Sequence, residues 1–224
     1  MGHVTWWAVV SSGCAPVLLL GGSATAAVVE GPDYNPVKQT ISVLAADNRA
    51  AYWAFTATLV ALGACHLATA CGLRAARLAG RLALGGGGIS AMLLALFPAP
   101  ATGGSLSHGS VVTVGFALLA AWPVLAARRR AVHAAPWGLR PLPSWVVTSL
   151  MVLGAAWFVV ENQRHGPAGV AERVLTAATA LWPVVVVISC LRHPPPAVGP
   201  RTAGPPVAGS PLPAPHDDTS EKST

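Results

Sequence analysis

The chain has 224 residues, of which 53% are hydrophobic and only 10% are charged. Soluble domains carry about 25% charged residues, so this chain has too few to cover a water-facing surface. The composition therefore argues against a soluble globular enzyme. The mean hydropathy of +0.56 indicates a chain that is solvated largely by lipid.

The basic residues favour a membrane protein over a nucleic-acid-binding protein. The formal net charge is +6 and the pI is about 9.8. Lys and Arg occur in short clusters between apolar runs, and they form no stripe or patch interleaved with aromatic residues. Such clusters are typical of the cytoplasmic ends of membrane helices. No nucleic-acid partner is predicted.

The cysteines predict neither a disulfide nor a metal site. Cys14, Cys65, Cys71 and Cys190 all lie inside apolar runs, and none belongs to a CxxC pair. Buried thiols in such runs behave as small hydrophobic side chains. No metal or other cofactor is therefore predicted.

Six apolar runs predict membrane helices, each of which needs about 20 residues to cross the hydrocarbon core. The runs cover residues 4–29, 51–73, 82–97, 111–127, 144–160 and 175–191. The third is the shortest and contains four glycines at 85–88, so we expect it to be the most irregular. The sequence thus predicts an all-α, six-helix membrane bundle over residues 1–193.

The first apolar run has two interpretations, a cleaved signal peptide or a retained helix. Ala24-Thr25-Ala26 resembles a cleavage site. However, no Lys or Arg precedes Trp6, and the apolar stretch is longer than that of a signal peptide. We favour the retained helix.

The distribution of charge predicts the orientation of the bundle. Ten of the 14 Lys and Arg residues fall on the side of the two termini, and four fall on the opposite side. The positive-inside rule makes the side of the termini cytoplasmic. Five acids fall on the outer side, namely Glu30, Asp33, Asp47, Glu161 and Glu172. We therefore expect a multi-pass protein of the plasma membrane with both termini in the cytoplasm.

The composition changes after the sixth apolar run. Residues 194–224 contain nine of the 20 prolines and few apolar residues able to pack. This pattern predicts a disordered, Pro-rich cytoplasmic tail that is dispensable for folding. The tail either recruits a partner through its proline motifs or is passive.

The outer loops gather polar side chains on one side of the membrane. The first loop, residues 30–44, is long for a link between adjacent helices; Asn35-Pro36 starts a turn, and residues 36–42 are predicted to form a short interfacial helix. The second loop covers residues 98–108. The third outer loop, between the last two apolar runs, holds Glu161, Asn162, His165 and Glu172. Together the loops carry a polar outer cluster of Glu30, Asp33, Ser42, His108, Glu161 and His165.

Two interpretations of the polar outer cluster remain open. Its members cap and tie the helix ends, or they share one functional pocket in which carboxylates and imidazoles perform acid–base chemistry. We expect Asp33, Ser42 and His108 to converge at the outer mouth of the bundle. Under the second interpretation, Asp33, His108 and Glu161 are the candidate catalytic residues.

His66 is the one ionisable residue well inside an apolar run. Ionisable side chains are costly in the hydrocarbon core, so such a residue is a functional candidate. Gly63, Thr69 and Ala70 share its helical face and favour close helix packing. We expect His66 to face a neighbouring helix, where a hydrogen bond to a carbonyl or hydroxyl would also explain it without function.

Two separated motifs carry a family resemblance. Asp33-Tyr34-Asn35-Pro36 is followed by Thr-Ile-Ser-Val-Leu at 40–44, and Leu96-Phe97-Pro98 is followed by a polar loop and His108. These motifs resemble those of the domain of unknown function 998 family, which are bacterial and archaeal membrane proteins that typically have six helices. The resemblance covers about residues 5–191 and implies no particular activity. Family members often carry an acid where this chain has Val43.

Two classes of function are compatible with these features. The first is a non-enzymatic envelope protein that organises or senses lipids or a protein partner. The second is a membrane-embedded enzyme whose outer acid–His site acts on a lipid or prenyl substrate as a cyclase or hydrolase. The chain has no P-loop, GxSxG or HExxH motif, and its halves do not resemble each other, which disfavours an inverted-repeat transporter. The expected partners are the lipid bilayer and a lipid or prenyl ligand.

Overall fold

The computed structural model describes residues 4–46, 49–100, 104–128 and 135–193. The predicted tail at 194–224 lies outside the described residues. Within the described part every regular element is helical. The elements are α1 (Trp6–Glu30), the short 3₁₀ helix η1 (Ile41–Ala45), α2 (Tyr52–Gly72), α3 (Leu78–Leu93), α4 (Leu106–Ala126), the 3₁₀ helix η2 (Trp137–Leu139), α5 (Pro141–Gln163) and α6 (Ala168–Leu191).

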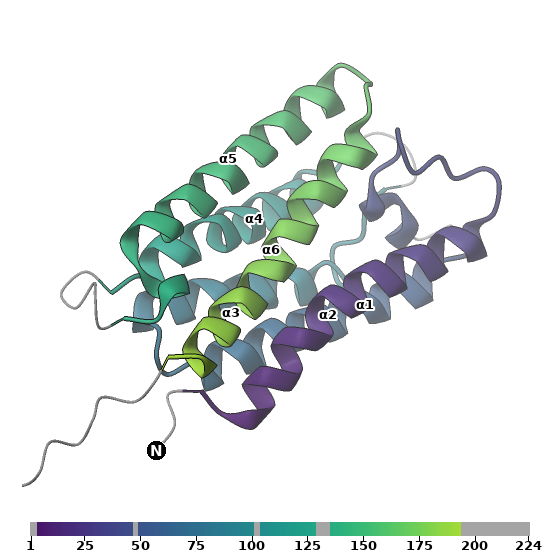
Figure 1. Cartoon of the computed structure of the whole chain (residues 1–224). Helices are drawn as coiled ribbons and strands as arrows, with labels where there is room; N and C mark the ends of the chain where they lie inside the picture. The colour runs from purple at the N-terminus through teal and green to yellow at the C-terminus, as the bar shows by residue number, and fades with distance from the viewer. Residues whose placement is uncertain (1–3, 47–48, 101–103, 129–134, 194–224) are drawn as a thin grey trace, which may run out of the picture. The chain divides into compact units, whose positions relative to one another are not determined.

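The six long helices form a closed ring. Each helix packs on the next one in the chain, and α6 packs back on α1. In Figure 1, α6 lies between α1 and α5 on the near side, while α3 and α4 lie behind. The first loop, η1 included, therefore lies at the end of the ring where α1 ends and α6 begins. We call this the loop end of the bundle.

The four glycines at 85–88 lie inside one continuous α3, contrary to the expectation of an irregular helix. A Cβ atom on Gly88 would lie 2.6 Å from the carbonyl oxygen of Gly63 on α2, and one on Gly87 would lie 2.5 Å from Leu119 on α4. Small residues allow helix backbones to approach closely, and that packing stabilises a helix that glycine alone would weaken. The glycine run thus joins α3 to both of its neighbours.

The lengths of the helices identify a membrane protein. In the described part of the chain, five helices, all of the long ones except α3, are long and apolar enough to cross a membrane. α3 has 16 residues and is therefore about 24 Å long, short of a hydrocarbon core of about 30 Å. The lipid-facing side of α5 exposes large apolar residues, including Leu142, Leu150 and Leu153. So much uncovered apolar surface fits lipid rather than water.

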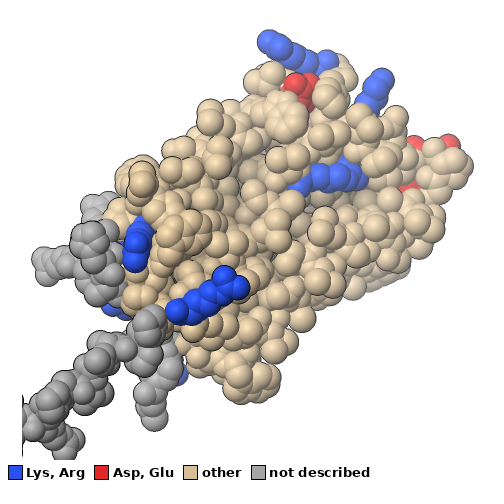
Figure 2. All heavy atoms as spheres, in the orientation of Figure 1, with Lys and Arg blue, Asp and Glu red and all other residues tan. Residues whose placement is uncertain are grey.

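Charged side chains lie near the ends of the bundle. On the face shown in Figure 2, all visible acidic side chains lie at the loop end, whereas basic side chains occur toward both ends. At the opposite end, the Nε atom of Arg81 donates to the carbonyl of Ala70 (2.6 Å), and that of Arg128 donates to the carbonyl of Ala75 (2.6 Å). Arg81 thus satisfies a carbonyl that the end of α2 leaves free, and Arg128 satisfies one in the link between α2 and α3.

Candidate functional site

The first loop folds through hydrogen bonds of its own. The Asn35 side chain accepts from the backbone N–H groups of Val37 (3.0 Å) and Lys38 (3.3 Å), and the Gln39 side chain accepts from the N–H of Asn35 (2.8 Å). Asn35-Pro36 therefore starts a turn, as its chemistry suggests. The short helix that follows is η1, at Ile41–Ala45, and not the predicted segment 36–42. The turn occupies the first half of that segment.

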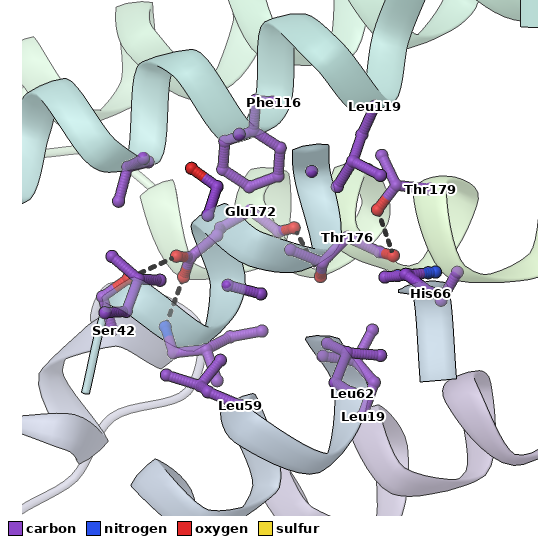
Figure 3. A pocket seen from close by; sticks show the side chains of 18 of the residues that line it. Leu19, Ser42, Leu59, Leu62, His66, Phe116, Leu119, Glu172, Thr176 and Thr179 are labelled. Carbon is purple, nitrogen blue, oxygen red and sulfur yellow. Dashed lines mark hydrogen bonds between the residues drawn. The ribbon is translucent and has the colours of Figure 1, made fainter. Parts of the chain in front are cut away.

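Glu172, in the second turn of α6, joins this loop to the bundle. Its side chain is 4% exposed. One carboxylate oxygen accepts a hydrogen bond from the backbone N–H of Ile41, and the other accepts from the hydroxyl of Ser42 at 3.0 Å. Figure 3 shows the carboxylate directed at these two donors. A buried carboxylate requires such partners, and here the start of η1 supplies them.

Arg173, the next residue of α6, holds the other half of the loop. Its Nη1 atom donates to the carbonyls of Pro36 (2.7 Å) and Gln39 (3.3 Å), and its Nη2 atom donates to the hydroxyl of Tyr34. The guanidinium carbon also lies 5.7 Å from the centroid of the Tyr34 ring. One planar cation thus fixes three points of the loop, which suits the fork geometry of arginine.

Tyr34 completes this contact. Its side chain is 6% exposed, and its hydroxyl donates to the carbonyl of Thr40 at 3.2 Å. Burial raises the pKa of Tyr34 above its ordinary value near 10, and the hydrogen bond from Arg173 opposes part of that rise. Because the phenol stays protonated at neutral pH, it can donate to Thr40 while it accepts from Arg173.

The loop lies directly on the first turn of α6. The backbone N–H of Val170 is shared between the carbonyl of Pro167 (3.0 Å), at the start of the helix, and the carbonyl of Val37 (3.3 Å), on the loop. A Cβ atom on Gly169 would lie 2.5 Å from the carbonyl oxygen of Pro36, and closer still to that of Gln39. Glycine at this position is what allows the loop backbone to approach so closely.

A cavity lies beneath η1 inside the ring of helices, with a volume of about 90 Å³. Its walls come from α1, α2, α3, α4, α6 and η1, and most of them are apolar. The lining includes Leu19, Ile41, Phe55, Leu59, Leu62, Val112, Phe116 and Leu119. Figure 3 shows Ser42 and the Glu172 carboxylate toward one end and His66 and Thr179 toward the other. The docked loop thus forms one end of an apolar cavity.

His66 lines the cavity at the end away from the loop. It is 2% exposed, and a Cβ atom on Gly88 would lie 3.0 Å from its own Cβ atom, so α3 packs tightly against this part of α2. Its Nδ1 atom is buried without a hydrogen-bond partner among the described residues. The non-functional explanation, a hydrogen bond to a neighbouring carbonyl or hydroxyl, therefore does not account for that nitrogen.

A family model described as protein of unknown function (DUF998) matches residues 13–189 of this chain, which is most of its length. The chain belongs to the DUF998 family. The resemblance drawn from the two loop motifs is thereby confirmed. Comparison with curated proteins and with solved structures finds no match.

The structure gives the first motif of this DUF998 protein a physical role. Tyr34 contacts Arg173, Asn35 organises the turn, and the Ile-Ser pair at 41–42 binds Glu172. In the second motif, the Nδ1 atom of His108 pairs with the carbonyl of Phe97 at 2.8 Å. Val43, where relatives often have an acid, is partly exposed beside these contacts.

The polar outer cluster predicted for this DUF998 protein is spread over several structural features. Among its described members, Ser42 lines the cavity. Glu30 forms an ion pair with Arg49 (2.8 Å) and accepts from the N–H of Ala51 (3.3 Å), so it ties the end of α1 to the start of α2. Asp33 and His165 are exposed at the surface. His108 lies in the first turn of α4, where its backbone N–H donates to the side chain of Ser105. Glu161 is partly buried and accepts a hydrogen bond from the Trp157 side chain at 3.2 Å.

Glu172 and Arg173 are the site residues that sequence reasoning missed. The sixth apolar run begins at 175, and this limit predicts that Glu172 lies in the third outer loop. That assignment is wrong, since α6 begins at Ala168 and buries Glu172 in its second turn. Pro167, which directly precedes the helix, is a usable signal for this earlier start.

Proposed function

We propose that this DUF998 protein binds an apolar, membrane-soluble molecule, a lipid or a prenyl chain, in the cavity beneath its first loop. Its role in the envelope is then non-enzymatic, as a carrier or sensor of that molecule. The observation that carries the proposal is the cavity itself, which is lined by five helices of the ring and by η1 and has mostly apolar walls. Binding sites for small molecules are concave, mostly apolar and provided with few polar groups.

The size and position of the cavity support a chain as the ligand. A volume of about 90 Å³ has room for the end of a chain, since one water molecule needs roughly 10–15 Å³ by the same measure. Ala91 on α3 and Val111 and Val112 on α4 line the cavity and are partly exposed on the bundle. A chain can therefore enter from the surrounding lipid while the rest of the molecule stays outside.

Binding is favoured over catalysis because the acid in the cavity is already engaged. Both carboxylate oxygens of Glu172 accept hydrogen bonds from the loop. A general acid or base must reach the reacting group of a substrate instead. The alternative catalytic residues Asp33, His108 and Glu161 are not among the described residues that line this cavity.

Filling the cavity tests the proposal. Ala91→Leu adds a larger side chain to the wall, and it is expected to reduce by several-fold the lipid or prenyl species that native mass spectrometry detects on the purified full-length protein. Ala79→Leu, on an exposed position of the same helix, is the matched control and should retain the wild-type amount. No bound apolar species on the wild type, or equal retention by Ala91→Leu, contradicts ligand binding in this cavity.

We also propose that all six long helices cross the plasma membrane with the loop end outside and both termini inside. Ten of 14 basic residues on the side of the termini support this orientation. A reporter that is active only in the cytoplasm should be active after Leu191 and inactive after Pro98. Activity after Pro98 together with inactivity after Leu191 would contradict six crossings with both termini inside.

A further inference from the structure

His66 differs from every other polar group in the wall of the cavity. The four lining hydroxyls donate to acceptors within the protein: Ser42 to Glu172 (3.0 Å), Ser90 to the carbonyl of Val111 (2.8 Å), Thr176 to that of Glu172 (2.9 Å) and Thr179 to that of Thr176 (2.8 Å). The Nδ1 atom of His66 has no partner among the described residues. An unpaired polar atom at this depth costs free energy, so the imidazole of His66 has hydrogen-bonding capacity that the protein does not use.

The charge of the lining restricts what that partner can be. Among the described residues that form the wall, only Glu172 and His66 are ionisable, and no Lys or Arg is present. A phosphate or carboxylate headgroup would meet no cation there and would lie in the same cavity as a carboxylate. A cationic group would find both oxygens of Glu172 already engaged by Ile41 and Ser42. An uncharged ligand is the one that this wall accepts without an unpaired charge.

We propose that the ligand is a neutral lipid with a single hydrogen-bonding oxygen, a hydroxyl or a carbonyl, and that this oxygen pairs with the imidazole of His66. The proposal rests on the proposed function, because it assigns the polar contact of the same cavity. The chain of the ligand packs against Leu59, Leu62, Phe116 and Leu119. Neutral imidazole carries one donor and one acceptor nitrogen, so it can pair with either a hydroxyl or a carbonyl oxygen.

A set of C15 prenyl probes tests which polar group of the ligand pairs with His66. Tritiated farnesol is bound to the full-length protein in detergent, and the competitors are unlabelled farnesol, the hydrocarbon farnesene, farnesal and farnesyl phosphate. Farnesol or farnesal is expected to displace at a concentration about tenfold lower than farnesene, which is the effect of one buried hydrogen bond. The better of the two identifies a hydroxyl or a carbonyl, and the phosphate should displace least well.

Two variants and one spectroscopic measurement assign the effect to His66. His66→Phe keeps a ring of similar size but removes the nitrogens, so it should bind farnesol and farnesene alike. His66→Asn, whose amide can occupy the place of Nδ1, should keep part of the preference. In the wild type, the ¹⁵N resonance of the His66 Nδ1 atom should move on addition of farnesol and not of farnesene, which decides the matter if a variant does not fold.

The outcomes distinguish this inference from the proposed function. If the wild type binds the oxygenated probes and farnesene saturably and with equal affinity, the contact with His66 is overturned and the cavity remains a binding site. The same conclusion follows if His66→Phe still prefers the oxygenated probes over farnesene. Tightest binding of the phosphate overturns the neutral ligand. Absence of saturable binding of every probe contradicts the proposed function itself.

Discussion

Replacing Glu172 with alanine is expected to detach the start of η1 from α6 and to lower the thermal stability of the protein strongly. The carboxylate is the acceptor for the Ile41 N–H and the Ser42 hydroxyl, and it is 4% exposed. Without it, each donor that stays buried costs about 1–3 kcal/mol. Differential scanning fluorimetry in detergent and hydrogen exchange of residues 31–46 measure the loss of stability and the loss of loop protection.

Asp33→Ala is the control for this substitution. Asp33 is an exposed acid on the same loop, and exposed substitutions usually change stability by less than about 0.5 kcal/mol. Glu172→Gln should fall between the two variants, because the amide keeps one acceptor oxygen but turns its NH₂ group toward a second donor. If Glu172→Ala has the same melting temperature as Asp33→Ala, and the amide hydrogens of Ile41 and Ser42 still exchange slowly, the carboxylate does not hold the loop.

Gly169→Ala is expected to displace the loop by steric overlap alone. The added Cβ atom would lie 2.5 Å from the carbonyl oxygen of Pro36 and closer still to that of Gln39, and both atoms belong to the backbone. Overpacking of this kind costs about 1–3 kcal/mol, which exceeds the roughly 0.5–1 kcal/mol that alanine gains over glycine inside a helix. The melting temperature should therefore fall, and the amides of residues 34–42 should exchange faster.

Gly21→Ala gives the matched comparison. Gly21 also lies inside a long helix, and a Cβ atom there would have no neighbour within 4 Å. This variant should melt at or slightly above the wild-type temperature, because only the helix preference changes. A melting temperature of Gly169→Ala that is equal to that of Gly21→Ala would show that the loop does not lie on α6 as described.

Both loop variants also bear on ligand binding, because Ile41 and Ser42 form part of the cavity wall. A displaced η1 opens the loop end of the cavity to water. The apolar ligand should then be retained less well by Glu172→Ala and Gly169→Ala, in proportion to the loss of loop protection. The loop therefore has two effects: it stabilises the bundle, and it separates the cavity from the water at the loop end.

The helices could be predicted from the sequence because hydrophobic runs report burial in lipid directly. The limits of those runs do not give the helix ends where polar residues are paired inside a helix. Glu172 and Arg173 lie in α6, and their partners are on the first loop, 130 or more positions away in the chain. A single sequence contains no local signal for such a contact.

The glycine run at 85–88 shows the same limit. Local propensity favours an irregular helix there, yet α3 is continuous because Gly63 and Gly88 bring two backbones together. The depth of His66 in an apolar run could be read from the sequence. Its unpaired Nδ1 atom could not, since it depends on which neighbours the ring of helices places around it.

A density map of the wild-type protein in lipid nanodiscs would show directly whether the cavity holds a ligand. We expect residues 31–46 to be docked on α6, and we expect an elongated, non-protein density in the cavity between Ser42 and His66, with one end at the imidazole. The same map of Ala91→Leu should lack that density while the loop stays in place. A wild-type cavity that is empty or holds only isolated water peaks, with the loop docked, would contradict binding of an apolar ligand in this cavity.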